Sequence, residues 1–244
     1  MLVKKKIKYI QSLGQKKFRQ QERLFIAEGP KLVKELLEAD ASMVKEVFAV
    51  QEWIRDNEKI LVKIAVTEIT ETELERISQL TTPNKVLAVV KQFDEGNNIS
   101  TKGKITLALD GIKDPGNLGT IIRTADWFGI KQIICSHDSA EVYNPKVVQA
   151  TMGSIARVKV FYTDLKEWLY EQKDVRIYAT TLDGQDVSAV KKIKEGIIVF
   201  GNESKGISDE ILQLANEKIS IPKKGKTESL NAAVAAGVVL GFLV

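Results

Sequence analysis

The second half of the chain alternates short, almost wholly apolar runs with longer segments of mixed polarity. Strands without a polar face are buried on both sides, which is typical of a mostly parallel sheet covered by helices on both faces. We therefore predict an α/β fold here. The expected strands are 105–109, 132–135, 177–180, 197–200, 218–221 and, more weakly, 156–161. The expected helices are near 118–128, 145–149, 165–171, 209–214 and 229–243.

The polar stretch 94–104, DEGNNISTKGK, has no hydrophobic periodicity and is predicted to be an interdomain linker. It separates a first domain, residues 1–93, from a second, residues 105–244. The first domain has its own alternation, which predicts a small α/β domain. Its expected helices are a basic one at 4–21 and others near 30–38, 52–59 and 71–79, and its expected strands are 24–27, 44–50, 61–66 and 86–91.

Composition narrows the function classes. The net charge of +4 permits a nucleic-acid partner without requiring one. The lone Cys135 cannot form an internal disulfide, and the lone His137 excludes histidine-based metal clusters and argues against a Ser-His-Asp triad, so we expect no metal. The start of the chain lacks the apolar core of a signal peptide, and the apolar run 231–244 is too short to span a bilayer. We expect a cytoplasmic protein whose last helix is buried in the core or at a subunit interface.

Parallel sheets bind ligands where the carboxyl ends of their strands meet, so three loops are of interest. The first is 110–129, DGIKDPGNLGTIIRTADWFG, in which Asn117 is the expected N-cap of a helix that begins at Leu118. Arg123 follows six residues later, close to two helical turns, so the two residues could line one side of that helix. Arg123 alone would also suit a salt-bridged surface position. The loop's glycines do not fit the G-x-G-x-x-G spacing of a dinucleotide-binding turn.

The second loop, FGNESKGIS at 200–208, supplies Glu203 between two glycines and a possible N-cap at Ser208, and it also suits an ordinary β–α turn. The third, IPKKGKTESLN at 221–231, contains Gly-Lys-Thr but has Ser220 where a phosphate-binding loop needs glycine, which excludes that motif. Ser229 is expected at or near the N-cap of the last helix. Asn231 is expected just inside that helix, where its side-chain amide would be buried and would need hydrogen-bond partners. Those partners could belong to a functional site or only to the core.

Together, N-L-G-x-x-x-R, G-N-E-x-x-G and I-P…S-L-N resemble the three motifs of the SpoU (TrmH) family, SPOUT-class RNA ribose 2′-O-methyltransferases, in family order across 105–244. The first domain resembles the family's substrate-binding extension, a small α/β domain related to ribosomal kink-turn binders, through its basic start and the stretch FIAEGPKLVKELL. Lys223-Lys224 depart from the family pattern, in which apolar or small residues often follow the Ile-Pro pair.

The resemblance implies a deep trefoil knot at the C-terminus, a homodimer whose active site is completed across the interface, and S-adenosylmethionine as cofactor. The residues implied to hold the cofactor are Thr180, Leu182, Gly201, Asn202, Gly206, Ile221 and Leu230. It also implies that the matching arginine, Arg123, is the essential catalytic residue. Because a guanidinium rarely deprotonates in proteins, we expect Arg123 to hold a phosphate and stabilise the developing alkoxide. Asn117, Glu203, Ser229 and Asn231 would orient Arg123 and the ribose, with Glu203 as an ion-pair partner.

The expected substrate is structured RNA, with ribosomal RNA favoured over transfer RNA. The basic start is a candidate RNA footprint, although a solvated helix face would look the same. Its candidate contacts are Lys4, Lys5, Lys16, Lys17, Arg19 and Arg23. Two alternatives belong to other classes: a catalytically inactive RNA-binding or ribosome-assembly module on the same fold, and a nucleotide-dependent oxidoreductase, which the missing glycine fingerprint disfavours.

Overall fold

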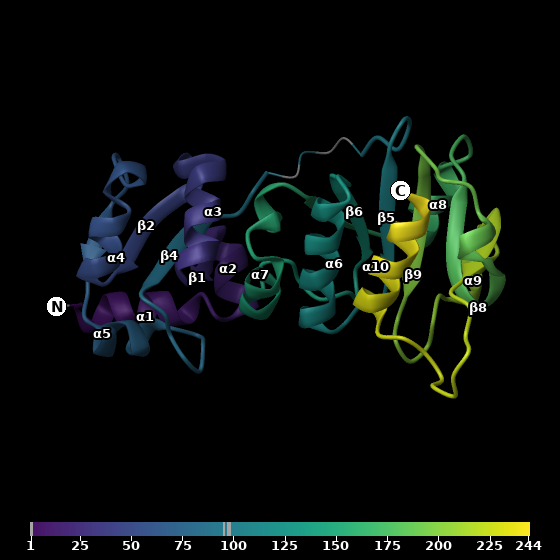
Figure 1. Cartoon of the computed structure of the whole chain (residues 1–244). Coiled ribbons are helices and arrows are strands. Elements are labelled where there is room, and N and C mark those ends of the chain that lie inside the picture. The colour runs from purple at the N-terminus through teal and green to yellow at the C-terminus, as the bar shows by residue number, and fades with distance from the viewer. Residues whose placement is uncertain (1, 95, 97–98) are drawn as a thin grey trace. The chain divides into compact units, whose positions relative to one another are not determined.

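The computed structural model describes residues 2–94, 96 and 99–244 (Figure 1). The chain forms two compact units, and their boundary is not a single point in the sequence. The first unit contains the residues up to 94 together with 141–157, and the second contains 95–140 and 158–244. A segment from the second half of the chain therefore packs into the first unit.

The first unit is built on a four-stranded mixed sheet. Its strand order is β1 (Leu24–Glu28), β4 (Val86–Lys91), β2 (Val44–Ala49) and β3 (Val66–Glu68). The central β4 runs antiparallel to both neighbours, and β2 and β3 are parallel. The α-helices are α1 (Lys4–Ser12), α2 (Lys16–Glu22), α3 (Pro30–Asp40), α4 (Gln51–Asp56), α5 (Glu71–Ile77) and α7 (Pro145–Thr151).

Three expectations for this unit were wrong. The helix predicted at 4–21 is two helices with a turn between them. Gly14 lies in that turn, where a Cβ would lie 2.5 Å from the Gln79 side-chain oxygen. The strand predicted at 61–66 is largely a turn in which Lys63 has a φ of +101°, and only β3 follows it. The helix predicted at 52–59 ends at Asp56 and is followed by a 3₁₀ turn, Glu58–Ile60.

Arg19 is one of two buried charged residues that hold segments of this unit together. Its side chain is 2% exposed, forms an ion pair with Glu141, and donates to the carbonyl oxygens of Leu13 (3.1 Å) and Gly14 (2.8 Å). The expectation that Arg19 contacts RNA was therefore wrong, because this guanidinium is buried and occupied. It instead ties the α1–α2 turn to the segment that leads into α7.

Glu28, at the end of β1, is the second buried charge, with 5% of its surface exposed. Its carboxylate accepts hydrogen bonds from the Ser78 hydroxyl and from the backbone N–H of Gln79 (2.8 Å). Burial raises the pKa of the Glu28 carboxyl, and the two hydrogen bonds oppose that shift only in part.

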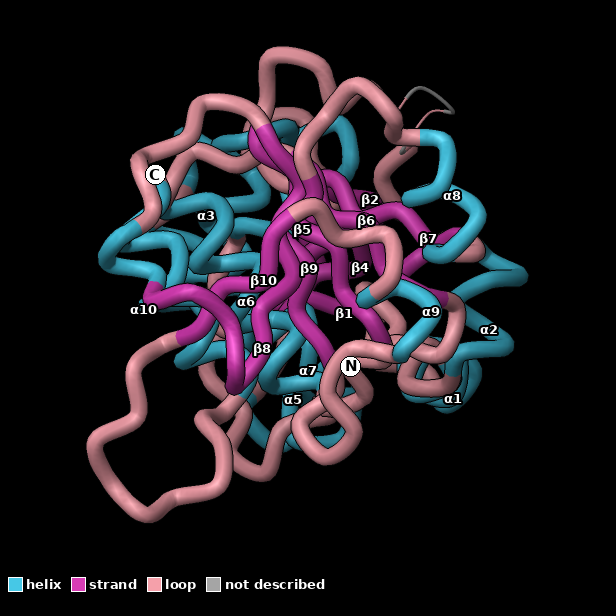
Figure 2. The backbone as a smooth tube through the Cα atoms, turned by 90° about the vertical axis from the view of Figure 1, so that its right-hand side faces the viewer, coloured by secondary structure: helices cyan, strands magenta, loops and turns pink. Residues whose placement is uncertain are grey.

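The second unit is a six-stranded, wholly parallel sheet, which confirms the predicted class. Its strand order is β10 (Glu217–Ser220), β8 (Ile177–Asp186), β9 (Gly196–Gly201), β5 (Ile105–Asp110), β6 (Gln132–Ser136) and β7 (Lys159–Thr163). Its helices are α6 (Pro115–Trp127), α8 (Leu165–Glu171), α9 (Asp209–Leu212) and α10 (Ala232–Leu243). Figure 2 shows α6 and α10 on one side of the strands and α8 and α9 on the other.

The edge strand β10 is held by an unusually close approach to β8. The pairing register shifts between Lys218 and Ile219, and a Cβ on Gly184 of β8 would lie 2.5 Å from the Ile219 backbone nitrogen. The Ser220 hydroxyl then donates to the Gly184 carbonyl (2.7 Å). The strand predicted at 177–180 continues to Asp186 because of this second stretch of pairing. No described helix is long and apolar enough to cross a membrane.

The raised pKa of Glu28 predicts how stability depends on pH. The pKa of a glutamate in an unfolded chain is about 4.3, so above that pH the folded state retains the Glu28 proton longer than the unfolded state does. Glu28 therefore contributes fully to the free energy of unfolding below the pKa of the unfolded state. This contribution falls as the pH rises through the higher pKa of Glu28 in the folded state. Urea titrations of wild type and Glu28→Gln should show wild type losing stability relative to the variant between acidic and neutral pH.

Glu73→Gln is the matched control with the opposite sign. Backbone N–H donors from Leu2 and Thr70 lower the pKa of Glu73, so its contribution is lost as the pH falls through the folded pKa. If wild type and Glu28→Gln kept a constant stability difference across this pH range, the assigned role of burial at Glu28 would be wrong.

Candidate active site

The three loops singled out in the sequence follow the carboxyl ends of β5, β9 and β10, and two of them are bonded directly to each other. Asp110, the last residue of β5, accepts a hydrogen bond from the Ser208 backbone N–H (2.8 Å). The Asn202 side-chain amide donates to the Gly111 carbonyl (2.8 Å). Because β5 and β9 are neighbouring strands, these bonds fix the first two loops side by side.

Three side chains from three different loops form a continuous hydrogen-bonded chain. Asn231 donates from Nδ2 to Oδ1 of Asn117 (2.8 Å), and Asn117 donates from Nδ2 to the Glu203 carboxylate. Asn231 Oδ1 in turn accepts the backbone N–H groups of Ala233 (3.0 Å) and Val234 (3.2 Å) at the start of α10. The helix cap therefore orients Asn231, which orients Asn117, and Asn117 holds the carboxylate. We call these three residues, taken in sequence order, the Asn–Glu–Asn network.

The expected helix starts were wrong in a way that explains this network. Helix α6 begins at Pro115, which suits the first position of a helix, and Asp114 is its N-cap through a bond from the Asn117 N–H (2.8 Å). Asn117 is thus inside the helix with its side chain free to reach the other loops. Helix α10 begins at Ala232, so Asn231 is its N-cap and is exposed, rather than a buried amide. Ser229 lies before the helix and is exposed, without a hydrogen bond to the network.

Arg123 lies apart from the network. At about 100° per residue, six residues separate Asn117 and Arg123 by about 120° around α6, so the two do not share a side, contrary to our expectation. Arg123 is exposed, and its guanidinium has no hydrogen bond or ion pair with any described residue. Glu203 is bonded to Asn117, so the expected Arg123–Glu203 ion pair is absent from the described structure. Trp127, one turn beyond Arg123, is 86% exposed.

The second loop is shaped by Asn202 and its glycines. Asn202 Oδ1 accepts the backbone N–H groups of Ser204 (2.9 Å) and Lys205 (3.1 Å), while the backbones of Asn202 and Gly206 exchange two hydrogen bonds. A Cβ on Gly201 would lie 2.2 Å from the Gly206 carbonyl carbon, and Gly206 has a φ of +70°. These contacts explain why the loop needs both glycines and an asparagine.

The residues implied to hold a cofactor lie in the middle of β8, on the second loop and on the third loop. Thr180 donates its hydroxyl to the Val199 carbonyl (2.8 Å). Leu182 and Leu230 are large apolar side chains with 78% and 46% of their surface exposed. Between the two β8 positions, Thr181 Oγ1 is a buried hydroxyl without a hydrogen-bond partner among the described residues. The exposed Leu182 and Leu230 side chains therefore offer apolar surface to a ligand, whereas the Thr181 hydroxyl is buried.

Sequence reasoning missed Asp110, Asp114 and Thr181. The Asp114-Pro115 pair carried a signal, because an Asp followed by Pro is a typical helix start. Asp110 could have been noted as the polar residue that ends an apolar strand. Nothing in the sequence marked Thr181 as an unsatisfied hydroxyl, since this depends on the neighbouring strands.

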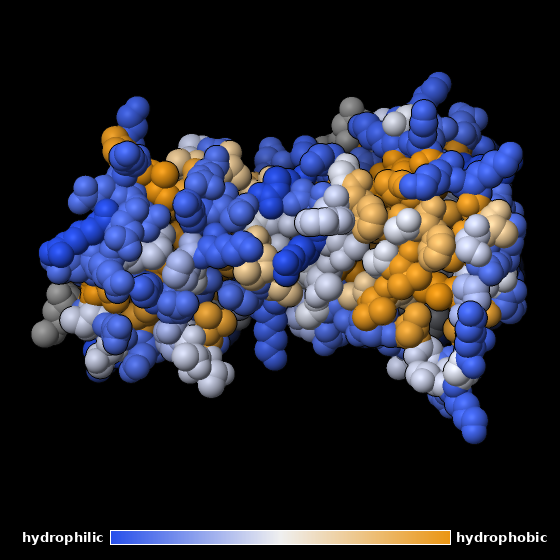
Figure 3. All heavy atoms as spheres, in the orientation of Figure 1, coloured by the Kyte–Doolittle hydropathy of each residue, from blue (hydrophilic) through white to orange (hydrophobic). Residues whose placement is uncertain are grey.

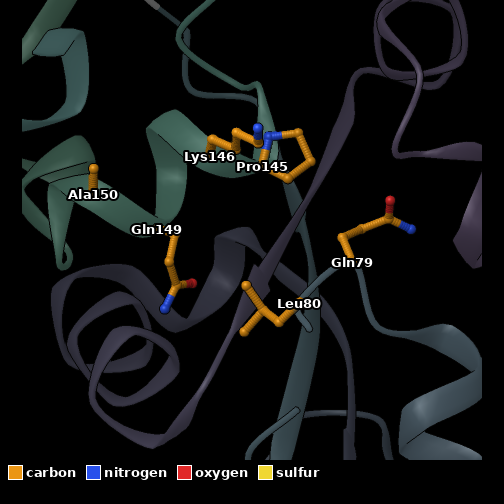
Figure 4. Close-up of a pocket in the computed structure, with 6 residues that line it drawn as sticks. All are labelled: Gln79, Leu80, Pro145, Lys146, Gln149 and Ala150. Atoms are coloured by element: carbon orange, nitrogen blue, oxygen red, sulfur yellow. The ribbon is translucent and has the colours of Figure 1, made fainter. Parts of the chain in front are cut away.

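The candidate RNA contacts lie on α1, α2 and the residue that follows them. Lys4, Lys5, Lys16, Lys17 and Arg23 are exposed, in contrast to Arg19. A surface hollow of about 280 Å³ also lies in the first unit (Figure 4). Its lining contains no carboxylate and none of the predicted site residues: it is formed by Gln79, Leu80, Pro145, Lys146, Gln149 and Ala150. We therefore locate the chemistry at the three loops of the second unit.

Two family models match this chain. The profile of the SpoU rRNA Methylase family matches residues 104–241, and that of the MRM3-like substrate binding domain matches residues 4–88. The 23S rRNA (guanosine(2553)-2′-O)-methyltransferase RlmP of Bacillus subtilis is 30% identical over 241 residues, covering 98% of this chain and 95% of that protein.

Two solved structures are similar over nearly the whole chain. A putative RNA methyltransferase of the TrmH family from Porphyromonas gingivalis is 35% identical with a TM-score of 0.85, covering 99% of this chain and 97% of that one. An AdoMet-bound rRNA methyltransferase from Sinorhizobium meliloti is 31% identical with a TM-score of 0.85, covering 98% and 94%. With its three motif loops joined at one end of a parallel sheet, the chain belongs to the SpoU rRNA methylase family.

Proposed function

We propose that this protein transfers a methyl group from S-adenosylmethionine to a ribose 2′-hydroxyl of RNA, with ribosomal RNA as the preferred substrate. The observation that carries the proposal is the Asn–Glu–Asn network, which joins Asn117, Glu203 and Asn231 across the three family motifs. The 23S rRNA 2′-O-methyltransferase of Bacillus subtilis, similar over nearly the whole chain, supports the same chemistry. A catalytically inactive RNA-binding module, the alternative, has no observation in its favour.

The exposed apolar side chains of the second unit suit S-adenosylmethionine, which is bound in the Sinorhizobium meliloti relative. Leu182 and Leu230 offer apolar surface for an adenine ring. Backbone groups of Gly201, Ile221 and Leu230 would complete the site, with Thr180, Asn202 and Gly206 shaping it. When bound, the cofactor supplies an electrophilic methyl group on a sulfonium sulfur.

The role of Arg123 follows from its free guanidinium. A guanidinium stays protonated in proteins, so Arg123 does not act as the base. With no carboxylate beside it, this side chain is available to bind the phosphate next to the target ribose and to stabilise the oxyanion that forms when the 2′-hydroxyl loses its proton. A phosphate oxygen or a water accepts that proton. Asn117, Glu203 and Asn231 position the ribose, and Ser229 is a further candidate contact.

The domain organisation and the knot are also proposals. We assign residues 1–93 to RNA substrate binding, 94–104 to a linker and 105–244 to catalysis, supported by the two profile matches. The path of the last residues favours a trefoil knot. β10 lies at one edge of the sheet beside β8, yet α10 packs against α6 and β9, so the chain returns across the sheet after β10.

An exposed apolar face supports a homodimer. Helices α6 and α10 pack together, and their outward side chains include Trp127, Val234 (53% exposed) and Phe242 (46% exposed). Figure 3 shows hydrophobic surface gathered over α10. Contiguous apolar patches on a soluble protein mark interaction sites. Because Arg123 is on the exposed side of α6, a partner seated here would help to complete the active site.

Arg123→Ala should abolish methyl transfer without weakening cofactor binding. Removing an electrostatic stabiliser of a developing oxyanion costs about 10²–10³-fold in rate, and Arg123 would also lose its phosphate contact. The measurement is transfer of labelled methyl groups to ribosomal RNA, with S-adenosylmethionine affinity determined by calorimetry. Arg176→Ala, which removes another exposed arginine of the same unit, is the control and should retain activity. Turnover of Arg123→Ala at the wild-type rate would refute the assignment.

Val234→Glu combined with Phe242→Glu should convert a dimer to a monomer and lower activity, because two charges would be buried without partners. Sedimentation velocity measures the change, and Tyr170→Glu, at a 63% exposed site on α8, is the matched control. Tryptophan fluorescence also reports dissociation of the dimer, since Trp127 is exposed while Trp53 and Trp168 are buried. A wild-type protein that remained monomeric at high concentration would exclude this interface.

A further inference from the structure

The loop between β10 and α10 projects from the second unit as an extended arm. Every residue from Pro222 to Leu230 is exposed, and no backbone hydrogen bond of the described structure involves residues 222–230. Figures 1 and 2 both show this segment reaching away from the sheet. Nine consecutive exposed residues are poorly explained by folding alone. We call residues 221–230 the lysine arm.

The arm carries uncompensated positive charge. Lys223, Lys224 and Lys226 form no ion pair or hydrogen bond with any described residue, and Glu228 is the arm's one carboxylate. Three like charges within four residues repel one another, which favours the extended shape unless an anion binds between them. Lys205 of the second loop and Arg123 are likewise without a carboxylate partner in the described structure. Each of the three loops therefore contributes at least one cation that has no carboxylate partner among the described residues.

Both ends of the arm are fixed by hydrogen bonds, and the second end lies in the Asn–Glu–Asn network. It begins after Ser220, which is bonded to Gly184, and it ends at Asn231, which belongs to the Asn–Glu–Asn network. The three lysines thus lie five to eight positions before Asn231 in the sequence. A chain this short keeps them near the ribose that the network would position.

We infer that the lysine arm binds the phosphates of the RNA strand on either side of the target ribose. The inference rests on the proposed function, because it takes RNA as the substrate. An RNA strand is the partner that matches an extended row of free ammonium groups, since it presents a phosphate at every nucleotide. Lysine–phosphate contacts carry no sequence information, so the arm positions the strand and leaves the choice of nucleotide to other residues.

The test is the salt dependence of RNA binding by the whole chain. Wild type and the variant Lys223→Ala/Lys224→Ala/Lys226→Ala are titrated against a fluorescein-labelled 20-nucleotide uridine strand at several KCl concentrations. Each phosphate contact to a single strand contributes about 0.7 to the slope of log K against log salt, so losing three should reduce the slope by about 2. The matched control is Lys102→Ala/Lys191→Ala/Lys194→Ala, three exposed lysines that precede β5 and β9 at the opposite, amino end of the sheet.

Two further measurements separate RNA binding from other roles. Replacing the three arm lysines by arginine should restore the slope, and S-adenosylmethionine affinity should be the same in all variants. Any of four results would overturn the inference. The first two are an unchanged slope in the arm variant and an equal reduction of the slope in the control variant. The others are a wild-type protein that does not bind the strand, and an arm variant that also loses affinity for S-adenosylmethionine. The binding assay requires no methyl transfer, so it is independent of the activity assay on ribosomal RNA. A reduced slope in the arm variant, together with no methylation of ribosomal RNA by wild type, would contradict the proposed function and leave the arm's role intact.

Discussion

The active site depends on one helix cap. Asn231 is held by two backbone N–H groups at the start of α10, and this fixes which way its amide donates. The donated hydrogen bond to Asn117 then joins the third loop to the first, and the bond from Asn117 to Glu203 joins the first to the second. Three loops separated by up to 114 residues in sequence are thus aligned by a chain of side-chain hydrogen bonds. A cap that α10 needs for its own stability also orients the groups that would hold a ribose.

Buried and exposed charged residues have different roles in this chain. In the first unit, Arg19 and Glu28 are buried and bonded, and they fix the α1–α2 turn and the 78–79 segment against their neighbours. In the second unit, Arg123 and the arm lysines are exposed and without partners in the described structure. Breaking a buried pair is costly because it leaves one charge unsatisfied, whereas an exposed cation is free to bind an anion. Burial therefore separates structural charges from those available to RNA.

Much of the fold follows from local sequence. Near-continuous apolar runs predicted β5, β6 and β9 almost to the residue, because strands buried on both faces leave little ambiguity. The prediction failed where distant contacts decide the outcome. β8 continues past Thr180 only because Gly184 lets β10 approach, and Arg19 resembles any other cation of a basic helix until Glu141, far away in sequence, is placed beside it. Likewise, the three motifs contain Asn117, Glu203 and Asn231, which the structure joins by hydrogen bonds. Arg123 was misplaced because six residues are clearly fewer than two full helical turns, so it lies on another side of α6 from Asn117.

The central claim is that the three joined loops direct a methyl group to a ribose oxygen. It is tested most directly by incubating the protein with unmodified 23S ribosomal RNA and S-adenosylmethionine carrying a deuterated methyl group, then digesting the RNA to nucleosides for mass spectrometry. We expect a labelled 2′-O-methylnucleoside at one position, marked by an alkali-resistant linkage. A label found only on a base, with every ribose 2′-hydroxyl unmodified, would contradict it.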